Sequence, residues 1–182
     1  MRGLLAHAAL DRLTAAGNLL PPSSTDETDE TEQIVDQFSS RVTRAARAMV
    51  PVYAVYFSFE NTVREFVAET LKDTYGDSWF EKVPKRIQSL VLSRKKELEK
   101  NKWFTYEPMS DVSQLLFGDL ASIISDQWTI FENFFPGQDW VKVRLNELEM
   151  SRNVIAHANE LPPEEIERIT RYLRDWLKQV PS

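Results

Sequence analysis

Cysteine is absent from this 182-residue chain, and histidine occurs only twice, at His7 and His157. Without cysteine there can be no disulfide scaffold, no thiol nucleophile and no thiolate zinc site. Two histidines so far apart do not form the closely spaced ligand pair that is typical of zinc sites. The 28 acidic residues show no grouping that predicts a magnesium site. We therefore expect no metal and no cofactor.

Basic excess and long apolar runs are also lacking. The net charge is −6, whereas proteins that grip nucleic acid without sequence preference carry surplus lysine and arginine. Any contact with nucleic acid is therefore expected to be local. No apolar run is long enough to cross a bilayer. The first 20 residues contain Arg2 and several leucines and alanines, but His7, Asp11 and Arg12 interrupt them and no cleavage site follows. These features favour a cytoplasmic protein without a membrane partner.

Helical periodicity dominates what is present. The five glycines are few for a turn-rich β fold, and from about residue 30 apolar residues recur at steps of three and four. Pro51 either kinks one long helix or opens a second one, and Gly76 is a helix stop. We next expect a turn capped by Ser78 and a helix after Pro84. A further helix, capped by Ser110, is expected over 112–135, and another from Asp139 to Ile155. The last helix begins at Pro162-Pro163 and is expected to bury Leu173, Trp176 and Leu177. The pattern predicts an all-α, antiparallel bundle of five to six helices.

The N-terminal part differs in composition. Residues 1–20 have the spacing of a short amphipathic helix, and Pro21 to Glu30 is a prolyl, hydroxyl-rich and acidic segment with nothing to bury. We expect an N-terminal arm and acidic linker over residues 1–29, followed by one helical domain over residues 30–182.

The segment from Ser151 to His157 contains the pairing that best fits a chemical function. Arginine holds phosphate with a permanent charge, and histidine transfers protons near neutral pH, so Arg152 and His157 together suggest chemistry on a phosphodiester. The phase of the fifth helix places Arg152 on its inner face, where an unpaired charge is costly. His157 lies about 140° further round an ideal helix, so the two side chains converge only if the helix ends or bends between them. The alternative is structural: an arginine that neutralises the helix dipole or pairs with a neighbouring helix, and a histidine that bonds a carbonyl.

Arg152-Asn153-x-x-x-His157, before a final amphipathic helix, resembles the Arg-x4-6-His signature of the HEPN superfamily (higher eukaryotes and prokaryotes nucleotide-binding domains). The similarity extends to the segments 59–66, 75–79 and 117–120, the last followed by Trp128 and Phe131, and covers roughly residues 30–180. In that family the residue after the arginine is commonly polar, as Asn153 is. One subgroup, neutralised by partner nucleotidyltransferases, carries tyrosine two residues after the histidine; this chain has Asn159 there.

The resemblance implies a metal-independent endoribonuclease, often a toxin or phage-defence effector, that dimerises so that two Arg-His pairs form one cleft. It implies that Arg152 and His157 are catalytic and that RNA is the substrate. The partners implied are a second copy of the chain and a regulatory protein, either an antitoxin or a sensor. Polar residues on the early helix can orient the pair in this family, which would give Glu60 and Arg64 supporting roles beside Asn153. A plain surface ion pair of Glu60 with Arg64 remains the alternative.

A basic segment between Trp79 and Lys102 is a second candidate for RNA contact, because cations beside the aromatics Trp103, Phe104 and Tyr106 can hold single-stranded RNA by charge and stacking. The alternative is a solvated helix face. The candidate residues are Lys82, Lys85, Arg86, Arg94, Lys95 and Lys96.

Two other functions stay open at this point. One is a HEPN-like helical adaptor that keeps the motif but only binds protein, RNA or nucleotide. The other is a plain helical dimerisation module in which Arg152 is structural.

Overall fold

The computed structural model describes residues 25–101, 103 and 110–180. The chain divides into two compact units, Met1–Ala45 and Ala46–Ser182. The described part is helical without any strand, which confirms the all-α prediction. The amphipathic segment of residues 1–20, with His7, and the aromatics Phe104 and Tyr106 lie outside the described residues. The domain boundary near residue 30 stays a prediction.

The described part of the first unit contains α2 (Thr25–Val35) and the first turns of α3 (Ser40–Tyr75). Residues 25–30, expected as linker, are therefore helical. Thr43 is buried and its hydroxyl donates to the carbonyl of Val35 at 3.1 Å. Ile34, Phe38 and Val42 recur at four-residue steps but are exposed. The helix breaks between Val35 and Ser40, so these residues do not share one helical face.

In the second unit, α3 continues without interruption through Pro51. Its buried face follows steps of three and four residues, as the spacing predicts: Tyr56, Phe59, Val63, Val67 and Leu71. Val55, which is next to Tyr56 in the sequence, is exposed. The helix ends at Gly76, whose φ of 68° is readily adopted only by glycine, so the predicted stop is confirmed.

The next segments differ from expectation at two points. Residues Gly76–Lys82 form a 3-10 stretch (η1) without the predicted side-chain cap from Ser78, and α4 (Lys85–Lys100) then begins after Pro84 as expected. The predicted helix over 112–135 is broken into η2 (Val112–Gln114), α5 (Phe117–Asp126) and α6 (Trp128–Phe131). Leu115 and Leu116 between them are extended, so Ser110 does not cap α5. The Asp119 carboxylate does so instead, accepting the Leu116 N–H at 3.1 Å.

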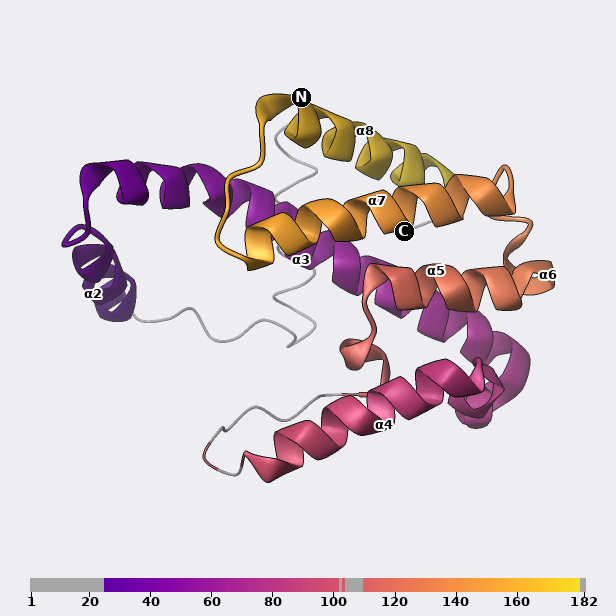
Figure 1. The fold of residues 1–182 in the computed structure, drawn as a ribbon. Coiled ribbons are helices and arrows are strands. Elements are labelled where there is room, and N and C mark those ends of the chain that lie inside the picture. The colour runs from indigo at the N-terminus through magenta and orange to yellow at the C-terminus, as the bar shows by residue number, and fades with distance from the viewer. Residues whose placement is uncertain (1–24, 102, 104–109, 181–182) are drawn as a thin grey trace. The chain divides into compact units, whose positions relative to one another are not determined.

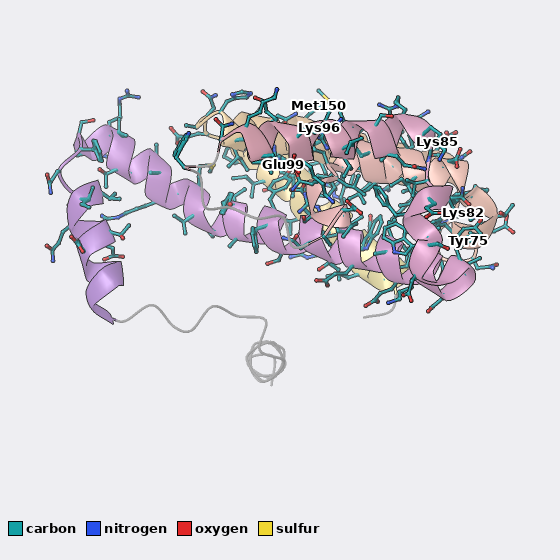
Figure 2. The ribbon with its side chains drawn as sticks, turned by 90° about the horizontal axis from the view of Figure 1, so that it is seen from below. Tyr75, Lys82, Lys85, Lys96, Glu99 and Met150 are labelled. Carbon is teal, nitrogen blue, oxygen red and sulfur yellow. The ribbon has the colours of Figure 1, made fainter. Side chains whose placement is uncertain are left out.

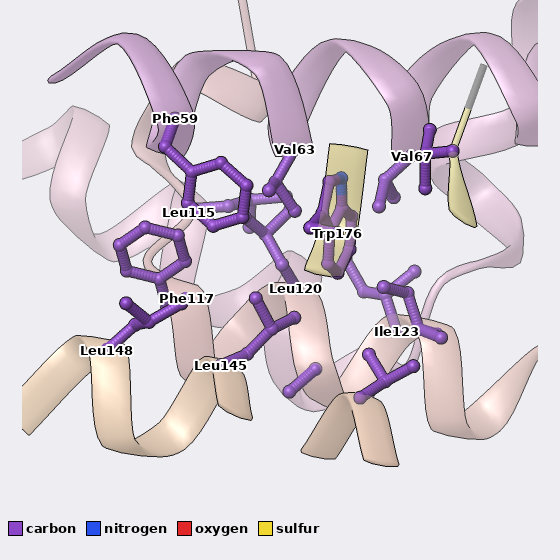
Figure 3. Packing of buried hydrophobic residues seen from close by; sticks show 14 of the residues in the cluster. Phe59, Val63, Val67, Leu115, Phe117, Leu120, Ile123, Leu145, Leu148 and Trp176 are labelled. Carbon is purple, nitrogen blue, oxygen red and sulfur yellow. The ribbon is translucent and has the colours of Figure 1, made fainter. Parts of the chain in front are cut away.

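The core of the second unit lies where α3 faces α5, α7 (Gln138–Ala156) and α8 (Pro163–Gln179). Figure 3 shows Phe59, Val63 and Val67 from α3 opposite side chains of α5 and α7, with Trp176 of α8 between them. Trp176 is 1% exposed and meets the rings of Phe59, Phe66 and other aromatics. Each such side chain contributes about 1.5–3 kcal/mol by leaving water. Leu177, expected beside it, is exposed, because one residue further along a helix turns the side chain by about 100°.

A polar network joins α7 to α8, which lie side by side in Figure 1. The Arg168 guanidinium pairs with Glu147 at 2.5 Å and with Glu165, and the Tyr172 hydroxyl donates to Glu147 at 2.7 Å. These bonds fix the direction in which α7 presents its C-terminal turn. No helix in the described part of the chain is long and apolar enough to span a membrane.

Candidate active site

A groove of about 540 Å³ opens between the middle of α3 and the last turn of α7. One wall is α3, the other is the end of α7, and Ser113 of η2 contributes as well. The lining residues are Tyr53, Tyr56, Phe57, Glu60, Asn61, Arg64, Ser113, Arg152, Ile155 and Ala156. The groove thus joins the supporting residues predicted on the early helix to the arginine of the motif.

Arg152 lies at the edge of the buried face of α7. The fully buried stripe runs from Leu148 to Ser151, which is 4% exposed, whereas the Arg152 side chain keeps 34% of its surface. Its Nε is 3.7 Å from Glu60 Oε2, and one Nη donates to Asn153 Oδ1 at 3.4 Å. The guanidinium is therefore held on one side and open on the other, a geometry that suits an anion arriving from solvent.

Glu60 is the buried acid that holds this arginine. It is 7% exposed, and its second oxygen pairs with Arg64 Nη2 at 2.9 Å. Burial raises the pKa of Glu60, and the nearby carboxylate of Glu149 acts in the same direction, whereas Arg64 and Arg152 lower it. One carboxylate thus binds two guanidinium groups at the inner end of the groove.

Arg64 has a different surrounding from Arg152. Its guanidinium donates to the Leu115 carbonyl at 2.9 and 2.6 Å and to Asn61 Oδ1 at 3.0 Å, and its side chain is 13% exposed. The extended residue Leu115 therefore turns its carbonyl toward α3. Arg64 ties the α5 entry to α3, so its guanidinium is committed within the fold.

Glu149 lies one turn before Arg152 on α7, and its role beside the groove was not predicted from the sequence. Its carboxylate accepts the backbone N–H of Gly118 at the start of α5, where a Cβ would come within 2.8 Å of Glu149 Oε2. The bond fixes α7 to α5 next to the groove. The glycine in the segment 117–120 was the only local signal for this contact.

His157 lies at the end of α7 and is exposed. Its N–H still donates to the Asn153 carbonyl at 3.0 Å, so helical geometry extends to it and most of the rotation from Arg152 is retained. Asn153 is exposed as well. His157 is not one of the described residues that line the groove. Within one chain, the structure places Arg152 in the groove and His157 outside its lining.

The backbone after His157 forms a complete Schellman motif. The Ala158 N–H donates to the Ile155 carbonyl at 2.9 Å, and the Asn159 N–H to the Val154 carbonyl at 3.1 Å. Ala158 has φ of 57°, a left-handed conformation that usually needs glycine. This turn ends α7 within the segment where the sequence predicts an end, and it fixes the backbone that carries His157.

In the basic segment, some cationic side chains are paired within the fold and others are exposed to solvent. Arg94 pairs with Asp119 at 2.9 Å and donates to the Gln114 carbonyl, and Lys95 pairs with Asp111. Lys82, Lys85, Arg86 and Lys96 are exposed. Figure 2 labels Lys82 in η1 and Lys85 and Lys96 on α4. Lys102 lies outside the described residues. Arg94 thus serves the packing of α4 on α5, and the exposed cations are the ones available to a phosphate chain.

The groove has few other groups that titrate. Burial raises the pKa of the Tyr56 hydroxyl, so this group stays neutral at pH 7. Among the residues that the structure describes, no three histidine or acidic side chains gather as metal ligands.

The family model for the Swt1-like HEPN domain matches residues 56–181, which is more than half of the chain. The chain belongs to the Swt1-like HEPN family. The matched region contains Glu60, Arg64, Arg152 and His157, whereas Tyr53 precedes it. No curated protein and no solved structure gives a significant match.

Proposed function

We propose that this HEPN protein is a metal-independent endoribonuclease in which Arg152 binds the scissile phosphate and His157 transfers protons. The observation that carries the proposal is Arg152 itself: a half-exposed guanidinium in a groove, steadied by a buried carboxylate, inside a HEPN domain. The 2′-hydroxyl of RNA attacks the adjacent phosphorus and the 5′-oxygen leaves. The products are a 2′,3′-cyclic phosphate and a 5′-hydroxyl end.

Glu60 is proposed as the positioning residue for Arg152. The reaction passes through a phosphorane with added negative charge, which a fixed guanidinium stabilises more than a mobile one. The 3.7 Å contact with Glu60 restrains the Nε side of Arg152, and one Nη donates to Asn153 Oδ1 at 3.4 Å, which leaves the other Nη for a phosphate oxygen. Arg64 holds Glu60 in turn.

The proposed site needs two copies of the chain. Attack by the 2′-hydroxyl needs a base, and departure of the 5′-oxygen needs an acid. Among the residues that the structure describes, His157 is the one histidine, and it is not part of the groove lining. A two-fold dimer supplies two His157 side chains, one as base and one as acid, and brings each toward an Arg152.

The direct test is cleavage of labelled RNA by the purified protein in EDTA. Wild type should give products with cyclic phosphate ends and leave DNA intact, because DNA lacks the 2′-hydroxyl. Arg152→Ala and His157→Ala should each lower the rate by at least about 100-fold. Arg171→Ala, which removes an exposed arginine of α8, and His7→Ala are the matched controls and should cleave normally. Equal rates in wild type and both site variants would refute the proposal.

A HEPN adaptor without catalysis is the second candidate, and one observation favours it: His157 and Arg152 do not share the groove lining within a chain. An adaptor would bind RNA or protein without cutting RNA. Binding of the labelled RNA that Arg152→Ala weakens, with no cleavage by wild type at any protein concentration, would decide for this candidate.

The biological role that we propose is that of a toxin or phage-defence effector, held in check by an antitoxin or a sensor protein. Expression of wild type in a bacterial host should slow growth, and His157→Ala should relieve this. Because Asn159 replaces the tyrosine of the nucleotidyltransferase-controlled subgroup, we expect a different kind of inhibitor.

A further inference from the structure

The outer half of the groove is aromatic. Tyr53 and Phe57 lie one helical turn apart on α3, are 59% and 60% exposed, and bring their ring centroids to 6.3 Å with a tilt of 38°. Neighbouring exposed apolar side chains that form a patch often mark a site of contact with another molecule. Both line the same groove as Arg152, so a ligand that touches one can touch the others.

The spacing along α3 matches the size of one nucleotide. Glu60, which holds Arg152, is three residues beyond Phe57 and seven beyond Tyr53, or about 4.5 and 10 Å along the helix axis. A groove of about 540 Å³ is within the range of sites for small ligands. When a phosphate binds Arg152, the neighbouring nucleobase therefore lies beside the rings of Tyr53 and Phe57.

We propose that Tyr53 and Phe57 form a stacking platform for the nucleobase next to the phosphate bound by Arg152. The ligand is single-stranded RNA, because bases of a duplex are already stacked and paired. This inference rests on the proposed function for the identity of the ligand. It adds a binding subsite and the residues that determine how tightly a substrate is held.

The polar groups of the groove indicate a platform that accepts different bases. The Asn61 amide donates to the Phe57 carbonyl at 2.8 Å and accepts from Arg64, and the Ser113 hydroxyl donates to the Ser110 carbonyl at 2.6 Å. These groups are committed within the chain and are poor readers of base edges. Every base has a π face, so stacking tolerates sequence and favours purines modestly through their larger area.

The first experiment uses a short single-stranded RNA in which the fluorescent base 2-aminopurine lies next to a non-cleavable 2′-deoxy linkage. Stacking on the rings should quench its fluorescence when wild type binds. The variant that carries both Tyr53→Leu and Phe57→Leu should bind roughly 10- to 100-fold more weakly and lose the quenching. Tyr53→Phe with Phe57→Tyr should retain both. Leu92→Ala, which changes an exposed apolar residue of α4, is the control and should behave as wild type.

The second experiment compares a normal RNA with one that has an abasic ribose at the same position. Wild type should prefer the normal RNA roughly tenfold or more in binding, and the double leucine variant should bind the two alike. The mass of each variant in solution is measured alongside. Unchanged quenching and preference in the leucine variant would overturn the inference. So would a leucine variant that becomes monomeric and loses affinity for normal and abasic RNA equally, because the rings would then be a subunit contact.

Both measurements are made on binding, so they separate this inference from the proposed catalysis. If wild type binds RNA with quenching but never cleaves it, the proposed nuclease fails and the stacking platform stands. If wild type cleaves RNA but shows neither quenching nor preference for the base, the platform fails and the nuclease stands.

Discussion

At the scale of single residues, the site depends on side chains and backbone positions that are restrained by contacts within the chain. Arg152 is restrained by Glu60, and the backbone of His157 by the turn at Ala158. Each restraint has an energetic cost that can be measured. Glu60 is ionisable and buried, and Ala158 is an L-residue in a left-handed conformation.

Replacing Ala158 by glycine should stabilise the protein by up to about 1 kcal/mol, because glycine adopts a φ of 57° without the steric cost that alanine has. Urea unfolding measures the change. Ala156→Gly, the same substitution two residues earlier in the last turn of α7, should destabilise by about 0.5–1 kcal/mol. If both substitutions destabilise equally, Ala158 is helical in solution and the Schellman turn does not form.

Glu60 should make stability depend on pH. Its pKa is raised above the usual 4.5, so the folded state binds a proton more readily than the unfolded state. The contribution of Glu60 to stability is therefore greatest at low pH and falls as the pH rises from 4.5 through the folded pKa. In Glu60→Gln this pH dependence of the unfolding free energy should disappear. The stability of the variant relative to wild type should therefore increase as the pH rises from 4.5 through the folded pKa of Glu60.

The measurement is the denaturant midpoint at several pH values for wild type and Glu60→Gln. Glu167→Gln changes an exposed carboxylate of α8 and corrects for general effects of charge. A wild type that gains stability over Glu60→Gln as the pH rises would show that the two arginines outweigh burial.

At the scale of elements, the sequence predicts several helix ends from proline or glycine, although α3 continues through Pro51. Gly76, Pro84 and the pair Pro162-Pro163 each lie where a helix ends or begins. The reason is local: proline cannot donate a backbone bond, and glycine at φ of 68° has no strain. The order of the major helices around the site could be predicted from these proline and glycine positions.

The break before α5 has no such mark. Val112, Leu115 and Leu120 fit a helical stripe, yet Leu115 is extended and buries its side chain while its carbonyl serves Arg64 of α3. That outcome depends on a partner 51 positions away in the sequence, which spacing alone cannot reveal. For the same reason the groove, with Tyr53 and Phe57 in it, and the contact of Glu149 with Gly118 could not be predicted.

The contact of Glu149 with Gly118 should couple α5 to α7. Gly118→Ala places a Cβ within 2.8 Å of the Glu149 carboxylate, which must then move and weaken its bond to the Gly118 N–H, so the substitution should destabilise by about 1 kcal/mol although alanine is the better helix former. In a Glu149→Ala background the same substitution should be neutral or stabilising. A double-mutant cycle from urea unfolding measures the coupling. Equal effects of Gly118→Ala in both backgrounds would show that α7 does not press on α5 here.

At the scale of the whole molecule, the proposed reaction needs two histidines, and His157 is the one histidine among the described residues. The proposal therefore makes activity depend on the assembly of two chains. Because each chain has a net charge of −6, the proposed dimer and the proposed contact with RNA would both depend on local surfaces rather than on overall charge.

Specific activity should therefore rise with protein concentration and level off as the dimer saturates, in parallel with the mass measured by sedimentation. Mixing wild type with a tenfold excess of His157→Ala should suppress cleavage, because most wild-type chains then pair with a partner that lacks the second histidine. An equal excess of an unrelated acidic protein should have no effect. The concentration at half-maximal activity should coincide with the dissociation constant of the dimer. Constant specific activity from a species of monomer mass would instead require that His157 and Arg152 of one chain meet on the substrate, which implies that the last turn of α7 unwinds when RNA binds.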